Sequence, residues 1–314
     1  MEQKYNIIGD IHGRTCWKEL IVEDAINIFV GDYFSPYEDI SFDKQQENFL
    51  EIIDFKTKHP ETILLIGNHD NQHWKNINPR ISRFDYANYQ VIKEMFEEFS
   101  DYFQVSYSIE NKVLVTHAGV TINWYVNQLT NAFVTHVIDL TAEEEQGCTN
   151  IETAFNQYHE YLKEKGFYEE PINGQVYLFK KNYYFIDEGL IRKMGHTPDV
   201  ISEKINQIWN DGKYKQFTFN EGASTFSDNY GTSPTHGPMW IRPYTLADYN
   251  IFSDNSEFHQ VFGHTMTKTV DTFNKLHMVD CLQFSVESLL VEVEEKEKLN
   301  FSVNHGKEKT TNGN

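Results

Sequence analysis

The chain has 314 residues, of which 39% are hydrophobic and 15% aromatic, so it is long and apolar enough to bury a substantial core. Its formal net charge of -20 would repel the phosphate backbone of DNA or RNA, which disfavours extended nucleic acid as a partner. The same charge repels small phosphorylated molecules unless metal ions or a few arginines reverse the local potential.

Cysteine usage and hydropathy predict a soluble, cytoplasmic protein. The three cysteines, Cys16, Cys148 and Cys281, are far apart and fit neither a disulfide framework nor a zinc motif. The first residues, MEQKYNIIG, enter an apolar run without the charged and long hydrophobic regions of a signal peptide. No apolar run approaches the roughly 18 residues that a membrane helix needs. We therefore expect no membrane partner.

Short apolar runs alternate with helical stretches in the first third of the chain. The runs are YNIIG at residues 5–9, INIFVG at residues 26–31 and TILLIG at residues 62–67. Runs of this length, separated by helical patterns, are typical of βαβ units with a parallel sheet. The fold class that we predict is therefore α/β.

Two helices and a hairpin are expected between and after these strands. Residues 41–60 begin at Ser41, a favourable helix cap, and place apolar side chains near one face, as residues 87–103 also do. Residues 104–119 alternate polar and apolar side chains on either side of Glu110-Asn111, which predicts a β-hairpin with its turn at that pair.

The middle of the chain has a different pattern. Residues 121–235 carry helical runs and an aromatic-rich stretch, and strand patterns return after Trp240 in HQVFGHT, HMVDCLQFSV and SLLVEVEE. We predict a single domain over residues 1–300, in which 121–235 form a largely helical insertion or cap, followed by a disordered tail at 301–314.

Side chains of the metal-ligand type follow five apolar runs, in the motifs IIGDIHG, FVGDYF, LLIGNHD, VLVTHAG and VFGHT. Loops that leave the carboxyl ends of neighbouring strands converge on one crevice of an α/β sheet. One site is therefore expected to hold Asp10, His12, Asp32, Asn68, His117 and His264. A rival for the last of these is His196, in an earlier Gly-His-Thr that follows no clean apolar strand.

This mixture of carboxylate, amide and imidazole, without thiolate, suits two divalent ions, with manganese as the first expectation and iron or zinc as alternatives. A carboxylate such as Asp32 can bridge two metals, where a shared water becomes hydroxide near neutral pH and attacks phosphorus. Arginine suits the remaining phosphate oxygens because its planar fork matches them, and Arg242, in GPMWIRP, is the candidate.

The order of the motifs GDIHG, GDYFS, GNHD, THAG, Arg242 and GHT resembles the calcineurin-like metallophosphoesterases, in their phosphoprotein phosphatase-like and diadenosine tetraphosphatase-like branch. The resemblance covers roughly residues 5–120 and 237–290 and leaves the middle unmatched. It implies a metallophosphoesterase-type β-sandwich flanked by helices. It also implies a phosphatase that hydrolyses monoesters of proteins, in the manner of serine/threonine phosphatases, or of small molecules.

The resemblance implies two metal sites that share a carboxylate. It divides the six ligands as follows: Asp10, His12 and the bridging Asp32 for one metal, and Asn68, His117 and His264 for the other. It also implies that His69 is the general acid that protonates the leaving oxygen, a task that suits an imidazole.

The chain departs from the family pattern at two positions. Ser35 stands where the family has an aspartate that orients the catalytic histidine, and Glu38, Asp39 or Asp85 are candidates to take over this role. Pro36 stands where the family has a phosphate-binding arginine.

Two other arginines are candidates for the missing phosphate contact. Arg80 and Arg83 both follow GNHD closely enough to reach the phosphate. The sequence does not choose between them.

Two other functions remain open at this point. The segment THAGVTINW is similar to a diadenosine tetraphosphatase motif, and the aromatic middle could stack bases, so symmetrical cleavage of dinucleoside polyphosphates is an alternative with a nucleotide substrate. The losses at Ser35 and Pro36 motivate a second alternative, a binding or scaffold module without activity. All predicted ligands and His69 are present, which argues against the scaffold.

Overall fold

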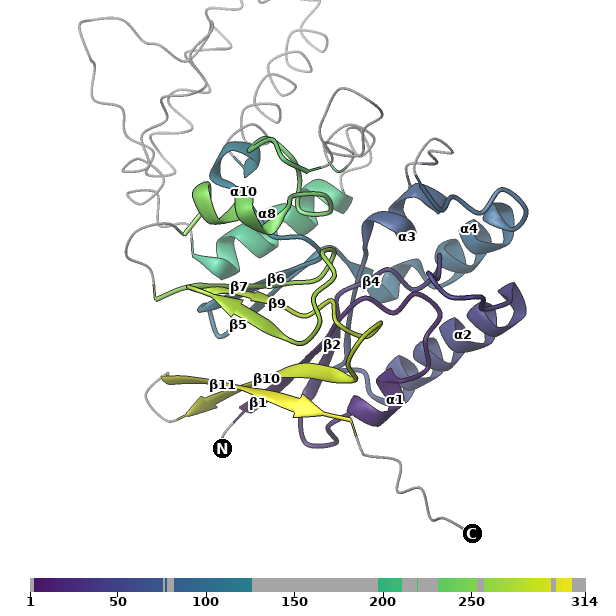
Figure 1. Cartoon of the computed structure of the whole chain (residues 1–314), viewed down its shortest axis with the longest axis horizontal. Helices are drawn as coiled ribbons and strands as arrows, with labels where there is room; N and C mark the ends of the chain where they lie inside the picture. The colour runs from purple at the N-terminus through teal and green to yellow at the C-terminus, as the bar shows by residue number, and fades with distance from the viewer. Residues whose placement is uncertain are drawn as a thin grey trace, which may run out of the picture. The chain divides into compact units, whose positions relative to one another are not determined.

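The computed structural model describes residues 3–75, 77, 82–125, 197–210, 219, 231–252, 257–294 and 298–306. The chain divides into two compact units, one made of residues 1–121 with 197–314 and the other of residues 122–196. Nearly all described residues belong to the first unit. That unit is a sandwich of two β-sheets flanked by helices (Figure 1), which confirms the predicted α/β class.

The first sheet has six strands in the order β11-β10-β1-β2-β3-β4. Their bounds are β1 (Gln3–Ile8), β2 (Ile26–Phe29), β3 (Ile63–Leu65), β4 (Phe103–Gln104), β10 (Glu287–Glu294) and β11 (Lys298–His305). Strands β1 to β4 run parallel, whereas β10 pairs antiparallel with both β1 and β11. The three apolar runs near the start of the sequence thus form the parallel strands that the βαβ pattern predicts.

The second sheet has five strands in the order β5-β6-β7-β9-β8. Their bounds are β5 (Ser106–Ile109), β6 (Val113–Thr116), β7 (His259–Phe262), β8 (Asp271–Phe273) and β9 (Leu276–Met278). Strands β5 and β6 form the predicted hairpin. Glu110 and Asn111 at its turn both have left-handed backbone, with φ of 47° and 52°, and the turn is closed by the N–H of Lys112, which donates to the Ile109 carbonyl at 2.9 Å.

The main core fills the space between the two sheets. Alternate side chains of β1, Tyr5 and Ile7, face this space and pack in one cluster with Val113 and Val115 of β6 and Val261 of β7. All five are almost completely buried, and each such burial contributes about 1.5–3 kcal/mol. This core fixes where the carboxyl ends of β1, β6 and β7 lie, and it therefore fixes the loops that follow them.

Helices cover the outer faces of both sheets. The helices are α1 (Trp17–Leu20), α2 (Phe42–Lys58), α3 (Asn68–His73), α4 (Tyr89–Glu98), the short 3-10 turn η1 (Ser100–Tyr102), α8 (Pro198–Asn210) and α10 (Pro243–Asp248). Of these, α8 and α10 lie on the second sheet. Phe29 of β2 contacts Trp17 of α1 and Phe55 of α2, with ring centroids 5.5 and 6.5 Å apart. Phe49 of α2 packs edge-on against Phe96 of α4 at 5.2 Å. Aromatic side chains thus join α1, α2 and α4 to the first sheet.

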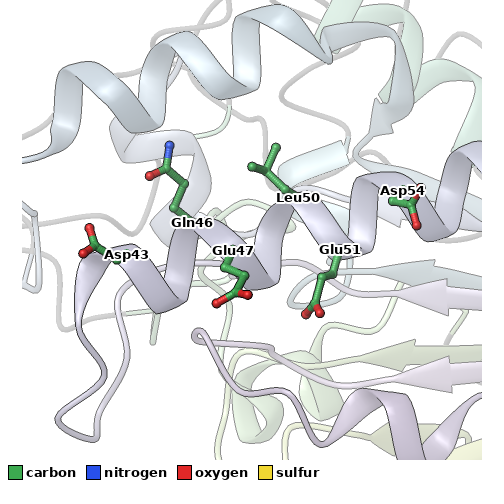
Figure 2. Close-up of a pocket in the computed structure, with 6 residues that line it drawn as sticks. All are labelled: Asp43, Gln46, Glu47, Leu50, Glu51 and Asp54. Carbon is green, nitrogen blue, oxygen red and sulfur yellow. The ribbon is translucent and has the colours of Figure 1, made fainter.

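The outer face of α2 is acidic. It borders a hollow of about 460 Å³ (Figure 2), which is lined by Asp43, Gln46, Glu47, Leu50, Glu51 and Asp54. Phe49, Ile52 and Ile53 of the same helix are buried, so the helix is amphipathic, as its sequence predicts. An acidic face of this kind would repel a polynucleotide.

Helix α8 lies inside the segment predicted as an insertion, but it belongs to the first unit and packs on β5 and β6. Asn206 explains the docking. Its side-chain oxygen accepts hydrogen bonds from the backbone N–H groups of Val105 and Ser106 at 3.0 and 3.2 Å, and its amide donates to the Ser106 carbonyl at 2.8 Å. The second compact unit ends at residue 196, so α8 belongs to the first unit although it lies within the segment 121–235 that we predict as an insertion. Most of the predicted helical runs of the insertion lie outside the described residues.

The predicted tail also begins too early. Residues 301–305 belong to β11, which pairs with β10 along its whole length from Lys298 opposite Glu294 to His305 opposite Glu287. The strand forms because Leu299 and Phe301 pack against the core between the sheets. Residues 307–314 lie outside the described part of the chain. No helix within that described part is long and apolar enough to cross a membrane.

Candidate metal centre

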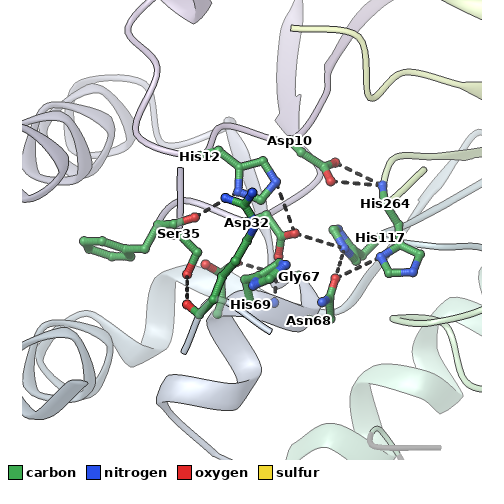
Figure 3. Close-up of polar contacts among 12 residues, drawn as sticks. Asp10, His12, Asp32, Ser35, Gly67, Asn68, His69, His117 and His264 are labelled. Carbon is green, nitrogen blue, oxygen red and sulfur yellow. Dashed lines mark hydrogen bonds and ion pairs between the residues drawn. The ribbon is translucent and has the colours of Figure 1, made fainter. Parts of the chain in front are cut away.

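The loops after β1, β2, β3, β6 and β7 bring the predicted ligands together. Figure 3 shows these side chains gathered around one point: Asp10, His12, Asp32, Asn68, His117 and His264. Since β1, β2 and β3 are parallel neighbours, and so are β6 and β7, their carboxyl ends lie at the same edge of each sheet. The convergence that the sequence predicts is thus present in the structure.

Three of these side chains form a compact cluster. Ligand atoms of Asp10, His12 and Asp32 all lie within 4.8 Å of one another, and all three residues are buried. The Oδ2 atom of Asp32 lies 3.6 Å from Nε2 of His12 and also 3.6 Å from Nε2 of His117. This carboxylate therefore faces two imidazoles from different loops.

The remaining ligands meet at Asn68. Its Oδ1 atom lies 2.8 Å from Nε2 of His117 and 2.9 Å from Nδ1 of His264. An amide oxygen has only lone pairs to offer, as do the deprotonated ring nitrogens of neutral imidazoles. A cation among these three atoms would satisfy all of them.

Backbone carbonyls fix the orientation of two imidazoles. Nδ1 of His12 lies 3.0 Å from the Phe34 carbonyl oxygen, and Nδ1 of His117 lies 2.9 Å from the Val30 carbonyl oxygen. A carbonyl accepts but does not donate, so the ring proton sits on Nδ1 and the Nε2 lone pair is exposed to the centre. This is the tautomer that a metal ligand needs.

Electrostatics also favour a bound cation. Burial, with the nearby Asp280, raises the pKa of Asp10, and burial with Asp70 raises that of Asp32. Burial lowers the pKa of His12 to about 3 and that of His117 to about 4, so both rings are neutral near pH 7. Among the described residues no lysine or arginine forms an ion pair with Asp10 or Asp32. Neighbouring buried carboxylates are costly without positive charge, and divalent metal ions would supply it.

Two glycines allow the carboxylates to sit this close to the backbone. A Cβ atom on Gly67 would lie 2.1 Å from Oδ1 of Asp32, and one on Gly263 would lie 2.0 Å from Oδ1 of Asp10. Any larger side chain would displace a ligand. The glycine in the strand exits LLIGNHD and VFGHT is therefore required by the site itself.

Three of the ligands have unusual backbone conformation. His12, Asp32 and His264 have φ of 46°, 55° and 64°, in the left-handed region. For residues other than glycine this conformation costs on the order of 1–2 kcal/mol each. Such cost is typical of functional sites, where the surrounding structure holds side chains in a required direction.

Comparison with known proteins agrees with this geometry. Residues 4–147 match the family model of the calcineurin-like phosphoesterases. The chain carries a calcineurin-like phosphoesterase domain. This match, together with the clustered carboxylates and imidazole, supports a hydrolase that acts on phosphate esters.

Similar solved structures include a protein serine/threonine phosphatase from Saccharomyces cerevisiae with similarity to human phosphatase PP5. It shares 14% sequence identity with this chain at a TM-score of 0.42, and the match covers 98% of this chain and 81% of that chain. No curated protein matches the chain.

The phosphoesterase domain contains a buried carboxylate that the sequence reading did not assign. Asp70 accepts hydrogen bonds from the backbone N–H groups of Asp32, Tyr33 and Gly67, at 2.6, 2.9 and 2.9 Å. It therefore joins the loop after β2 to the loop after β3 and holds Asp32 in place. Its position in GNHD, directly after the predicted ligands, was the available signal.

His69 lies next to the ligands. Its backbone N–H donates to Oδ1 of Asp32 at 2.9 Å, and its ring is 5.5 Å from that of His12 between centroids. Its Nδ1 atom lies 3.0 Å from Nε2 of Gln72, one turn further along α3. Among the described residues, Gln72 is thus the side chain that contacts Nδ1 of His69.

Two of the three carboxylates considered for that role have other partners, and the third, Asp39, is exposed. Glu38 forms a bidentate ion pair with Arg14 at 3.0 and 3.1 Å. Asp85 accepts from the backbone N–H groups of Ala87 and Asn88 at the start of α4, at 3.1 and 3.0 Å.

The candidate phosphate-binding arginines differ in their placement. Arg242 is partly buried and donates from Nη1 to the His264 carbonyl at 3.2 Å and to Thr265 Oγ1 at 3.1 Å, so it lies beside a predicted ligand. Arg83 lies over the ring of Tyr37, with its guanidinium carbon 3.4 Å from the ring centroid. Arg80 lies outside the described residues, as does His196.

A second carboxylate beside the ligands was also missed. Asp280 follows β9, is buried, and interacts with Asp10. Burial raises its pKa to about 7, against the opposing effects of Arg14 and Arg242. The run HMV before Asp280 is an apolar strand exit like the others, so the rule that found the ligands would have found this residue as well.

Two further histidines contact each other away from the ligands. Nδ1 of His259, at the start of β7, lies 2.9 Å from Nε2 of His277 on β9, and Nδ1 of His277 lies 3.0 Å from Thr272 Oγ1. The His277 ring stacks on Phe301 with centroids 4.3 Å apart. The sequence pattern indicates no role for these two residues, which we call the histidine pair.

Proposed function

We propose that the chain hydrolyses phosphate monoesters in the manner of serine/threonine protein phosphatases, with two divalent metal ions at the described centre. The observation that carries this proposal is the position of Asp32, whose Oδ2 atom is 3.6 Å from the ligand nitrogen of His12 and 3.6 Å from that of His117. A carboxylate that faces two ligand sets is what a two-metal phosphoesterase site requires.

The ligands fall into two sets around Asp32. Asp10 and His12 would hold one metal with Asp32, and Asn68, His117 and His264 would hold the other. Oxygen and imidazole donors without thiolate favour manganese, with iron or zinc as alternatives. When bound, such ions supply Lewis-acid activation of water and of the phosphoryl oxygens.

His69 is placed to act as general acid. Departure of an alcohol from phosphorus requires a proton on its oxygen, and a positioned imidazole can donate it. The acid form of this ring is the imidazolium, which carries a proton on each nitrogen. With its amide turned, Gln72 would accept from Nδ1–H of His69 through its carbonyl oxygen, at the place where its side chain now lies 3.0 Å from that nitrogen. Gln72 would therefore orient the ring, with the Nε2 proton available to the leaving oxygen.

Arg242 would hold the phosphoryl group. Its Nη1 atom donates to the His264 carbonyl and to Thr265 Oγ1, which fixes the side chain next to the centre, and a planar guanidinium matches the geometry of phosphate oxygens. Its charge also helps to overcome the net charge of -20, which would otherwise repel an anionic substrate. Substrates of the proposed class are phosphorylated proteins or small molecules, and we expect them to be met in the cytoplasm.

The first test is hydrolysis of p-nitrophenyl phosphate, a phosphoserine peptide and diadenosine tetraphosphate with manganese present. Asp32→Asn should lower turnover by about 10³-fold or more, because it removes the charge shared by both ligand sets. Asp24→Asn makes the same chemical change at a side chain that is 70% exposed, and it serves as the control.

Each outcome of this test has a definite meaning. Faster turnover of the two monoesters supports the proposal, whereas preference for diadenosine tetraphosphate would replace it with dinucleoside polyphosphate cleavage. No turnover of any substrate by metal-loaded wild type would refute it.

A further inference from the structure

An arginine from outside the ligand loops is held at the edge of the centre. Arg83 follows α3, and its guanidinium carbon lies 3.4 Å from the ring centroid of Tyr37, which is a close cation–π contact. The Tyr37 ring in turn packs edge-on against the ring of His12, with centroids 4.9 Å apart. One aromatic ring therefore separates this guanidinium from a predicted metal ligand.

The backbone next to Tyr37 holds the same arginine. Ser35 Oγ donates to the Arg83 carbonyl at 3.2 Å, and Arg83 Nη1 donates to the Pro36 carbonyl. Ser35 and Arg83 both have left-handed backbone, with φ of 63° and 64°. Three consecutive residues, 35–37, thus form a seat for Arg83, and the backbone conformation that this needs is costly at two positions.

Arg83 and Arg14, the two arginines near His12, differ in their surroundings. Arg83 is exposed, and among the described residues no carboxylate forms an ion pair with it. Arg14 differs, because it is 9% exposed and its fork is occupied by Glu38. Of these two arginines, Arg83 is the one whose fork is open to a ligand.

We propose that Arg83, seated on residues 35–37, binds the phosphoryl group of the substrate together with Arg242. The inference rests on the proposed function and adds a specificity element to it. A planar guanidinium that is held by a ring and a carbonyl presents its remaining N–H groups in a fixed direction, which suits the tetrahedral oxygens of a phosphoryl dianion. Ser35 and Pro36, which read in the sequence as losses, then serve to hold an arginine supplied by another loop.

The test compares Arg83→Ala and Arg83→Lys with wild type, all loaded with manganese. For p-nitrophenyl phosphate, Arg83→Ala should raise KM and the inhibition constant of inorganic phosphate about tenfold or more, since a charge-assisted hydrogen bond is lost. Arg83→Lys should recover only part of this, because an ammonium lacks the planar fork. Lys93→Ala removes one positive charge on α4 and should change neither constant.

A second variant tests the seat. Tyr37→Leu removes the ring but keeps Arg83. Like Arg83→Ala, it should weaken the binding of phosphate. Calorimetric titration of each protein with inorganic phosphate gives a readout that needs no turnover. The proposed function would fail if wild type hydrolysed no ester, and the titration would still test Arg83. Unchanged KM, inhibition constant and phosphate affinity in folded Arg83→Lys and Tyr37→Leu, with only a lower melting temperature, would show that Arg83 merely ties two loops together.

Discussion

The two ends of strand β7 carry imidazoles in opposite chemical settings. At its start, the histidine pair joins His259 to His277 at 2.9 Å, and Thr272 takes up the remaining nitrogen of His277. Beyond its end, His264 meets the Asn68 oxygen, which also faces His117. Donors and acceptors match in the pair, whereas in the centre the Nε2 lone pair of His117 faces the Asn68 oxygen, which is also an acceptor. A buried histidine therefore indicates a metal only where its lone pair points at other lone pairs.

The largest effect should come from breaking the centre at a ligand. His117→Ala removes the imidazole that faces both Asp32 and Asn68, so the variant should bind one metal fewer and lose about 10²-fold or more in turnover. Metal content measured on the purified protein, alongside kcat for p-nitrophenyl phosphate, checks this. His277→Gln is the matched control from the histidine pair, and it should keep its metal content and its kcat. Equal losses in the two variants would remove the distinction between the two regions.

A smaller loss, in manganese affinity, is expected at Asp70, which accepts hydrogen bonds from the backbone on either side of the centre. Asp70→Asn keeps the shape but leaves only one oxygen to accept from backbone N–H groups that now lie 2.6–2.9 Å from the carboxylate. Because these bonds position Asp32, manganese affinity should fall by about 10–100-fold. Titration with manganese measures it, with Asp54→Asn on the exposed face of α2 as the control. Unaltered manganese affinity would mean that Asp70 serves folding alone.

The contact between Gln72 and His69 should affect rate and leave metal binding intact. Gln72→Leu leaves Nδ1 of His69 without its partner, so kcat should fall about tenfold for an alkyl phosphate and less for p-nitrophenyl phosphate, whose leaving group needs little protonation. His69→Ala should show the same dependence on leaving group more strongly. The ratio of the two kcat values is the readout, and an unchanged ratio would contradict the general-acid assignment.

The smallest effect belongs to the histidine pair and concerns stability. Burial lowers the pKa of His277 to about 3, whereas the unfolded chain takes up this proton near pH 6.5. Protons therefore favour the unfolded state as pH falls from about 6.5 toward 3, and at pH 5 His277 should cost about 2 kcal/mol of the stability present at pH 7. Urea unfolding of wild type and His277→Gln at both pH values measures this. The free energy of unfolding of His277→Gln should fall less than that of wild type between pH 7 and pH 5. Equal falls in the two proteins would contradict the prediction.

Much of the centre follows from sequence because its ligands obey a topological rule. Asp10, Asp32 and Asn68 each follow a glycine at the end of a parallel strand, and such ends meet wherever the sheet forms. The hairpin turn at Glu110 and Asn111 follows equally from local preferences. These features depend on short stretches of chain, so the sequence alone predicts them.

The partners of the ligands depend on geometry that a linear pattern does not contain. Gln72 meets His69 only because α3 begins at Asn68 and one helical turn brings the two together. Arg83 contacts Tyr37 through a turn with left-handed backbone, which its sequence does not predict. The strand nature of residues 301–305 likewise arises from pairing with β10. Long-range contacts, rather than local preference, decide all three.

A hydrogen bond joins the two parts of the centre that are most distant in the sequence, and it determines when during synthesis the centre can be completed. The N–H group of His264 donates to the Asp10 carboxylate at 3.0 Å, across 254 positions of the chain. During synthesis β1 leaves the ribosome long before β7, and domains form only as their segments become available. Closing a loop of this length costs little more than closing one of half its size, so the intervening segment can vary with small penalty. A nascent chain that stops short of β7 therefore lacks both the last imidazole and the N–H group that holds Asp10, and the ability to cleave phosphate esters arrives as a late event of folding.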